Sequence, residues 1–85
     1  METTTRCLLL KNDQVLISEI EEVQAELGDP NCKLINPFIL DRTTSELHVW
    51  LNFTDQNEIM LRSEDILTMV EPSPDILKKY ESIKY

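Results

Sequence analysis

The side chains best suited to metal binding or nucleophilic catalysis are those of Cys7, Cys32 and His48. A structural zinc site needs four Cys or His ligands, usually in closely spaced pairs, whereas none of these three residues lies within four positions of another. The sequence pattern points to no nucleophile with a partnering base. We therefore expect a protein that is not an enzyme and holds no metal or cofactor. Both cysteines are expected to be packing residues in a reduced cytoplasm.

Glutamates at positions 19, 21, 22 and 26 offer a second set of candidate metal ligands. In an extended strand, successive side chains point to opposite faces, so these carboxylates are separated rather than gathered. A solvated acidic face is the favoured interpretation of this cluster.

The overall charge is strongly negative, because 16 acidic residues stand against 8 basic ones and give −8 at pH 7. This balance argues against broad, phosphate-driven binding of nucleic acid, although it permits a small local site. The single glycine excludes the glycine-rich loops that cradle phosphates. No apolar run has the length of a membrane span or of a signal-peptide core, so we expect one soluble domain in the cytoplasm and no membrane partner.

Most of the chain has the residue pattern of β-strands, and these strands must position the candidate residues named above. Apolar and polar residues alternate from residue 46 to residue 53, which predicts a strand with one buried face. The residues expected on that face are Leu47, Val49, Leu51 and Phe53.

Turn residues 55–57 follow that strand, so a second strand at 58–62 is expected to form a hairpin with it. Further strands are predicted at residues 6–11, 34–41 and 66–70. The strand at 34–41 is interrupted by Asn36-Pro37, which predicts a bulge or an edge position because proline cannot donate to a sheet.

Residues 14–27 fit two structures. Apolar residues recur at helical spacing through this segment, and Gly28 and Pro30 are suited to end a helix. The alternative is a strand that begins near Val15, after a hairpin turn at Asn12-Asp13. The local pattern does not decide between helix and strand.

Residues 72–85 form a separate C-terminal segment. Ser73 is a suitable N-cap and Pro74 suits the first helical position, which predicts a short amphipathic helix. A helix of about ten residues does not persist alone in water. Its apolar face is therefore expected to dock on the main domain, residues 1–71, or on a neighbouring subunit.

Two segments resemble the motifs of the Sm-like (LSm) protein family. Residues 10–23, Leu-Lys-Asn-Asp-Gln-Val-Leu-Ile-Ser-Glu-Ile-Glu-Glu-Val, are similar to the first Sm motif, with Ser18 at its bend glycine and Val23 at its aromatic position. Residues 59–66, Ile-Met-Leu-Arg-Ser-Glu-Asp-Ile, are similar to the second motif, with Arg62 on the family arginine and Ser63 replacing the glycine. In size, acidity and trailing helix the chain looks most like the small Sm-like proteins attributed to cyanophages.

The resemblance implies an all-β fold, in which five strongly bent antiparallel strands form a small open barrel that is followed here by the short helix. It also implies that residues 14–27 are a long bent strand. An open barrel leaves two edges with unpaired backbone groups. Because residues 47–53 and 66–70 carry no proline and few charges, we expect these edges to pair with identical neighbours in a homomeric ring of roughly five to seven copies.

Family members bind single-stranded RNA at the pore of the ring, so the resemblance implies a site around Arg62. A guanidinium offers planar donors and a stacking face to an unpaired base. The competing interpretation is that Arg62 forms an ion pair with Glu64 or Asp65 and only anchors a turn. Further polar contacts are expected from the loop after the bent strand, where the candidates, each also interpretable as an ordinary loop residue, are Asn31, Lys33 and Asn36.

His48 and Trp50 lie on the face opposite the predicted apolar stripe. An aromatic pair of this kind is one way to stack the bases of a single strand. The favoured interpretation is that Trp50 packs in a subunit interface or under the C-terminal helix.

Two functions are consistent with these observations. The first is an Sm-like ring-forming protein that binds single-stranded RNA at its pore, in the cytoplasm of the host cell if a phage encodes it. The alternative is an Sm-fold assembly or protein-interaction module without RNA binding, for which the charge of −8 per subunit is the main support.

Overall fold

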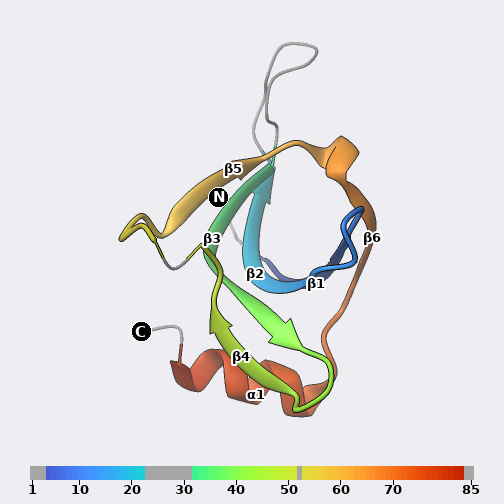
Figure 1. Ribbon diagram of the computed structural model, residues 1–85, viewed down its shortest axis with the longest axis vertical. Helices are drawn as coiled ribbons and strands as arrows, with labels where there is room; N and C mark the ends of the chain where they lie inside the picture. The colour runs from blue at the N-terminus through green and yellow to red at the C-terminus, as the bar shows by residue number, and fades with distance from the viewer. Residues whose placement is uncertain (1–3, 23–31, 52, 84–85) are drawn as a thin grey trace.

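The computed structural model describes residues 4–22, 32–51 and 53–83 of the chain. Within these ranges six strands, one 3-10 turn and one helix follow one another (Figure 1). They are β1 (Thr4–Leu10), β2 (Val15–Glu22), β3 (Cys32–Asp41), β4 (Glu46–Val49), β5 (Glu58–Leu61), η1 (Ser63–Asp65), β6 (Ile66–Val70) and α1 (Pro74–Ile83).

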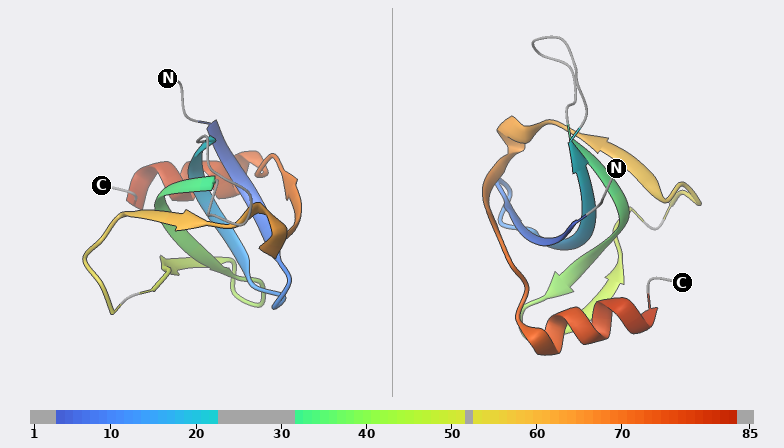
Figure 2. Two further views of the ribbon diagram at one scale, coloured as in Figure 1. Left: turned by 90° about the horizontal axis from the view of Figure 1, so that it is seen from above. Right: turned by 180° about the vertical axis from the view of Figure 1, so that it is seen from behind.

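The strands form one antiparallel sheet in the order β4-β3-β2-β1-β6, with β5 also paired to β3. Residues 32–35 of β3 pair with β5 and residues 38–41 pair with β4, so β5 and β4 lie end to end along β3. The sheet curls strongly and stays open (Figures 1 and 2). The predicted all-β fold with a short C-terminal helix is confirmed, and β4 and β5 together take the place of one strand among the five predicted.

The strand β2 is bent at Ser18. Its pairing with β3 shifts register between Ile17 and Glu19, and the Ser18 side chain is fully buried. The hydroxyl Oγ of Ser18 donates to the carbonyl oxygens of Glu19, at 2.8 Å, and of Ile35, at 3.1 Å. These bonds satisfy a polar group that a glycine would not have. The strand interpretation of this segment is therefore confirmed for residues 15–22, and its remainder lies outside the described residues.

The gap between β4 and β5 follows from the backbone of the strands that flank it. Pro37 in β3 has no N–H to donate to a neighbour. Asn36 and Leu51 have left-handed backbone angles, with φ of 54° and 57°, which turn each chain away from the regular pleat. The N–H of Trp50 donates to the Pro37 carbonyl at 3.2 Å, after which the chain leaves the sheet until β5 begins.

Three predictions about this region are wrong. The strand predicted at residues 46–53 ends at Val49, and β5 pairs with β3 rather than forming a hairpin with β4. The predicted burial fails for Val49, which is 54% exposed, and for Phe53, which is 81% exposed, whereas Leu47 and Leu51 are half-buried. Trp50 instead packs against the core of its own chain.

The core lies inside the curl of the sheet. Leu8 and Leu16 are cross-strand partners with no exposed surface, and Ile39, Trp50, Leu61 and Ile66 pack around the central cluster. That cluster consists of Leu8, Leu10, Leu16, Ile20 and Leu34. Burial of each such side chain stabilises the fold by about 1.5–3 kcal/mol before the entropy of ordering is counted.

The C-terminal helix begins where the sequence predicts. The Ser73 hydroxyl oxygen accepts from the N–H of Ile76 at 3.4 Å, and the Ser73 carbonyl accepts from the N–H of Leu77 at 2.9 Å. Ser73 is therefore the N-cap of α1. Among the described residues, no helix is long and apolar enough to cross a membrane.

Tyr80 fixes α1 to the sheet and is fully buried. Its hydroxyl shares its single hydrogen between the carbonyls of Ile35, at 3.1 Å, and Asn36, at 2.9 Å, and accepts from the N–H of Glu19 at 3.2 Å. Its ring meets that of Phe38 edge to face, with centroids 5.8 Å apart. One side chain thus holds α1 against β2 and β3 at the place where both strands bend.

Candidate functional site

Arg62 directly follows β5 and is exposed. Among the residues that the structure describes, no carboxylate forms an ion pair with it. The turn into η1 is closed instead by the backbone, since the N–H of Asp65 donates to the Arg62 carbonyl at 3.1 Å. Ion pairing with Glu64 or Asp65 is therefore not what holds this turn, and the guanidinium faces solvent.

Lys33 is paired rather than free. Its Nζ lies 2.6 Å from Glu58 Oε1, a residue of β5. The hydrogen bond to Glu58 raises the pKa of Lys33 above its usual value, and the charges of Glu58 and Glu21 add to this effect against a smaller opposing effect of burial. In the pairing of β3 with β5, Cys32 lies opposite Leu61, the residue before Arg62. Lys33, the next residue of β3, is therefore close to Arg62 in register. The negative charge of Glu58 largely offsets the positive charge of Lys33 at this position.

Asn36 lies elsewhere, at the bend of β3. Its N–H donates to the Asn57 carbonyl at 2.7 Å. Its position is three residues from Lys33, or about 10 Å along a strand. Asn31, the remaining candidate, lies outside the described residues. The structure thus brings Arg62 and Lys33 to one end of β5, and Asn36 to the gap at the other end.

The left-handed backbone of Asn36 predicts a measurable difference between two substitutions. Asn36→Ala should lower the free energy of unfolding by about 1 kcal/mol relative to Asn36→Gly, because alanine resists a φ of 54° and glycine does not. Both variants lack the amide side chain, so its loss does not contribute to the difference between them. Urea unfolding followed by circular dichroism measures the difference, and equal midpoints would show that the backbone angle has no energetic consequence.

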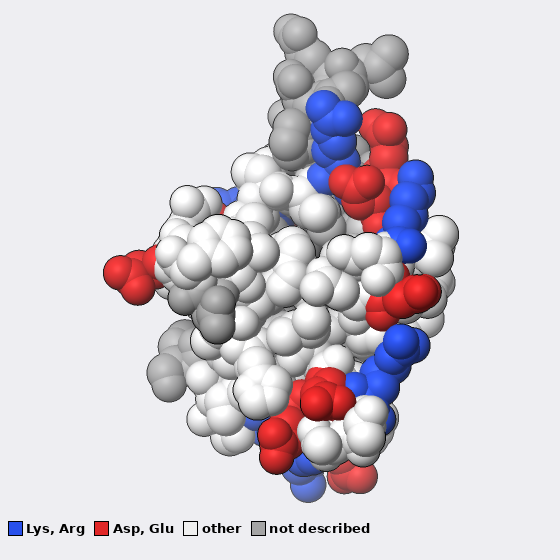
Figure 3. All heavy atoms as spheres, viewed as in Figure 1, with Lys and Arg blue, Asp and Glu red and all other residues white. Residues whose placement is uncertain are grey.

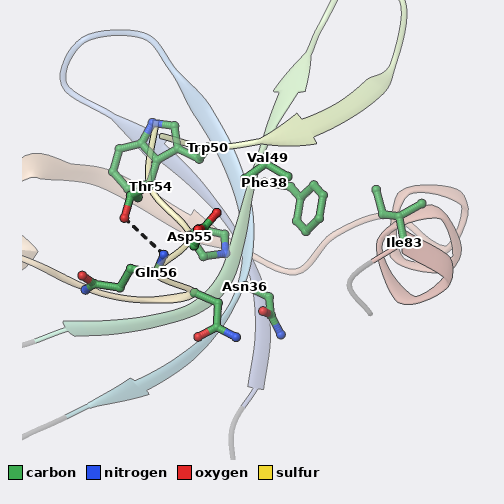
Figure 4. Close-up of a pocket in the computed structure, with 10 residues that line it drawn as sticks. Asn36, Phe38, Val49, Trp50, Thr54, Asp55, Gln56 and Ile83 are labelled. Carbon is green, nitrogen blue, oxygen red and sulfur yellow. Dashed lines mark hydrogen bonds between the residues drawn. The ribbon is translucent and has the colours of Figure 1, made fainter. Parts of the chain in front are cut away.

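A cavity of about 320 Å³ lies where β4 ends and β5 begins (Figure 4). One wall is the bend of β3, with Asn36 and Phe38. The end of β4, with Val49 and Trp50, continues this wall because Val49 pairs with Phe38, and the loop of residues 54–57 adds further lining. Ile83, near the end of α1, completes the rim. We refer to this hollow as the gap cavity.

The sequence prediction missed the gap cavity, apart from naming Asn36 as a polar contact. The available signals were the Asn36-Pro37 interruption and the turn residues 55–57. Because a hairpin was predicted, β5 was placed beside β4. With both strands on β3, the same residues enclose a hollow.

Apolar side chains are exposed on the two edges of the sheet. On β6, Leu67 is 57%, Met69 is 41% and Val70 is 52% exposed, and on β5 Met60 is 44% exposed. Both strands have one neighbour in the sheet, β1 for β6 and β3 for β5. We call these four residues the apolar edges. Such edges are unusual on a free monomer because they invite pairing with another chain.

The groups first considered for metal binding or catalysis are dispersed. Burial raises the pKa of the Cys7 thiol, which keeps it protonated and weakly nucleophilic. His48 is exposed, with Nε2 3.6 Å from a carboxylate oxygen of Glu46, and does not join Trp50 in the gap cavity. Within the described residues, no three Cys, His, Asp or Glu side chains gather as a metal site.

Charge is mixed on the face shown in Figure 3. Positive and negative side chains alternate down the side of the molecule where η1 and β6 lie, and uncharged side chains fill the centre. This face carries no broad basic surface, which agrees with the charge of −8.

These features define a small, open, antiparallel β-sheet protein with a docked C-terminal helix, two apolar edges and the gap cavity. The chain belongs to the Family of unknown function (DUF6561), whose model matches residues 3–85. No curated protein matches it.

Proposed function

We propose that this chain is the subunit of a homomeric ring of the Sm-like type, with roughly five to seven copies, and that the ring binds single-stranded RNA at its pore. The open antiparallel fold, the bend of β2 at Ser18 and the two motif resemblances support the Sm-like character. Ring formation is argued from the sheet edges, and RNA binding from Arg62.

The observation that carries the proposal is the exposure of β6. Four of its five residues, 67–70, are exposed, and three of them are large apolar side chains. An isolated subunit would leave this apolar strand in water on its outer edge and on both faces. Pairing it with a second chain supplies partners for its backbone groups and removes that apolar surface from water.

The partner surface is available on the same subunit. Among the described residues, no second strand pairs with the outer edge of β5, and Met60 is exposed on that strand. β5 has four residues and β6 has five, so their lengths match. A contact of β6 with the β5 of a neighbour joins two different surfaces, and such head-to-tail contacts close into a ring when the rotation permits.

Arg62 supports RNA as the ligand of the ring. It lies between β5 and β6, the two strands proposed to pair, so ring closure would repeat this exposed cation once per subunit around the axis. A guanidinium both stacks on a base and donates hydrogen bonds to it. Unpaired RNA suits such a site because its bases can be splayed out.

A ring without RNA binding is the second candidate. It is favoured by the Lys33–Glu58 ion pair, which neutralises the cation nearest to Arg62 in register, and by the charge of −8 on every copy. This net charge repels polyanions, so Arg62 must act against it.

A titration of labelled single-stranded oligonucleotides into the protein separates the two candidates. We expect binding at about 50 mM salt that weakens as salt rises, since phosphate contacts release counterions. Arg62→Ala should weaken binding about tenfold, whereas Arg42→Ala, which removes another exposed arginine from the β3–β4 turn, should not. If wild type did not bind at low salt, the proposal of RNA binding would be wrong. If wild type and Arg62→Ala bound equally, Arg62 would not be part of the binding site.

A further inference from the structure

The gap cavity has apolar walls and a size suited to a side chain. About 320 Å³ is at the lower end of ligand pockets, which span roughly 300–1,000 Å³, so it accommodates one or two side chains rather than a large cofactor. In Figure 4, Trp50 and Phe38 lie on opposite sides of the hollow, and Ile83 approaches from α1. Val49 and Ile83 are 54% and 40% exposed, so the apolar rim is open to solvent.

The polar groups of the gap cavity favour a cation. Asp55 is the charged residue of its lining, and the other polar side chains there are neutral, among them Asn36, Gln56 and Asn57. In the described part of the chain, Asp55 has no ion-pair partner and no Lys or Arg lines the hollow. A carboxylate only accepts hydrogen bonds, so this rim attracts a donor that carries positive charge.

The walls hold their shape without a ligand. The Thr54 hydroxyl accepts from the N–H of Gln56 at 3.2 Å, the Asn57 carbonyl accepts from Asn36, and the indole N–H of Trp50 donates to Gln14 Oε1 at 3.4 Å. With its N–H directed to Gln14, Trp50 offers the hollow the apolar surface of its ring. An arriving group therefore meets a preformed apolar slot beside one carboxylate.

We infer that the gap cavity is a docking site for a basic segment of a partner protein, which inserts an aliphatic side chain between Trp50 and Phe38 and pairs an adjacent Lys or Arg with Asp55. Charge complementarity argues for this partner, since the whole chain carries −8 and one of its carboxylates, that of Asp55, lines the site. The same charge disfavours an anionic ligand such as a phosphate. The inference does not depend on the proposed ring or on RNA.

Trp50 is the sole tryptophan of the chain and lines the cavity, so its emission reports directly on occupancy. The probes are three blocked tripeptides: Arg-Leu-Arg, the charge-reversed Glu-Leu-Glu and the anchorless Arg-Gly-Arg. We expect a saturable change in Trp50 emission with Arg-Leu-Arg, and at least about tenfold weaker binding of each of the other two peptides. This comparison uses the wild-type chain alone, so it does not depend on the folding of a variant.

Two variants assign the charge contact. Asp55→Asn should weaken Arg-Leu-Arg binding about tenfold, whereas Asp13→Asn, the same change in the β1–β2 turn, should leave it unaltered. Asparagine tolerates the left-handed backbone of position 13, where φ is 68°, so this control preserves the turn.

Two results would overturn the inference. They are equal binding of the three peptides and no saturable change up to about 10 mM peptide.

Discussion

Leu67→Glu is expected to convert the assembled protein into monomers. Leu67 is 57% exposed on β6, the strand proposed to pair with the neighbouring subunit, and assembly would bury it. A carboxylate carried into that contact loses hydration without gaining a partner, which costs several kcal/mol. Each contact of the ring should therefore weaken by more than about a hundredfold. Light scattering coupled to size-exclusion chromatography measures the result as a fall in particle mass.

The matched control for this variant is Thr43→Glu. Thr43 lies in the exposed β3–β4 turn, away from β5 and β6, and the substitution adds the same charge. We expect its particle mass to equal that of wild type. If Leu67→Glu also kept the wild-type mass while remaining folded by circular dichroism, β6 would not be the contact between subunits.

Tyr80→Ala is expected to lower the free energy of unfolding by about 3–5 kcal/mol, because it removes a fully buried aromatic ring and the bonds that hold α1. Tyr80→Phe keeps the ring and its contact with Phe38 but removes the hydroxyl. The carbonyls of Ile35 and Asn36 and the N–H of Glu19 then each lose this partner. Loss of the hydroxyl alone should cost about 1–3 kcal/mol, or on the order of 10 °C in Tm.

Thermal unfolding at one fixed protein concentration measures both Tyr80 variants, since assembly makes Tm depend on concentration. Lys78→Ala, at an exposed position of the same helix, serves as the control and should change stability by less than about 0.5 kcal/mol. If Tyr80→Phe had the same Tm as wild type, the hydroxyl would not be what holds α1 to the bent strands.

Local sequence signals could predict most of the strands and the helix. Asn12-Asp13 indicated a turn, and Asp13 has a φ of 68° with its N–H donating to the Leu10 carbonyl at 3.0 Å. Ser73-Pro74 indicated the start of α1, and Ser73 caps it. These features depend on residues adjacent in the chain, so their chemistry is visible in the sequence.

The interrupted edge could not be predicted in this way because its cause lies in another strand. Pro37 in β3 removes a donor that faces the residues after Val49, and Leu51 turns the chain outward. The alternation of apolar and polar residues from residue 46 to residue 53 indicates neither effect. Trp50 therefore packs on the core although its position in the pattern placed it on the polar face.

The candidate site was predictable only at the level of single residues. Arg62 is exposed, as an RNA contact requires, but the partner of Lys33 comes from β5. The Lys33–Glu58 ion pair depends on the register between β3 and β5, which the sequence does not display. Asn36 was chosen as a polar contact, and its backbone proved as important as its side chain because it forms the bend beside the gap cavity.

The mass of the wild-type particle at micromolar concentration tests the central claim most directly. Native mass spectrometry or light scattering should give one species at a whole multiple of the 9.9 kDa chain, with roughly five to seven copies. A species of 9.9 kDa at that concentration would contradict the account, because β6 would then remain unpaired in water. A dimer would also contradict it, because a symmetric contact between two identical edges would leave the other edge of each subunit without the proposed partner.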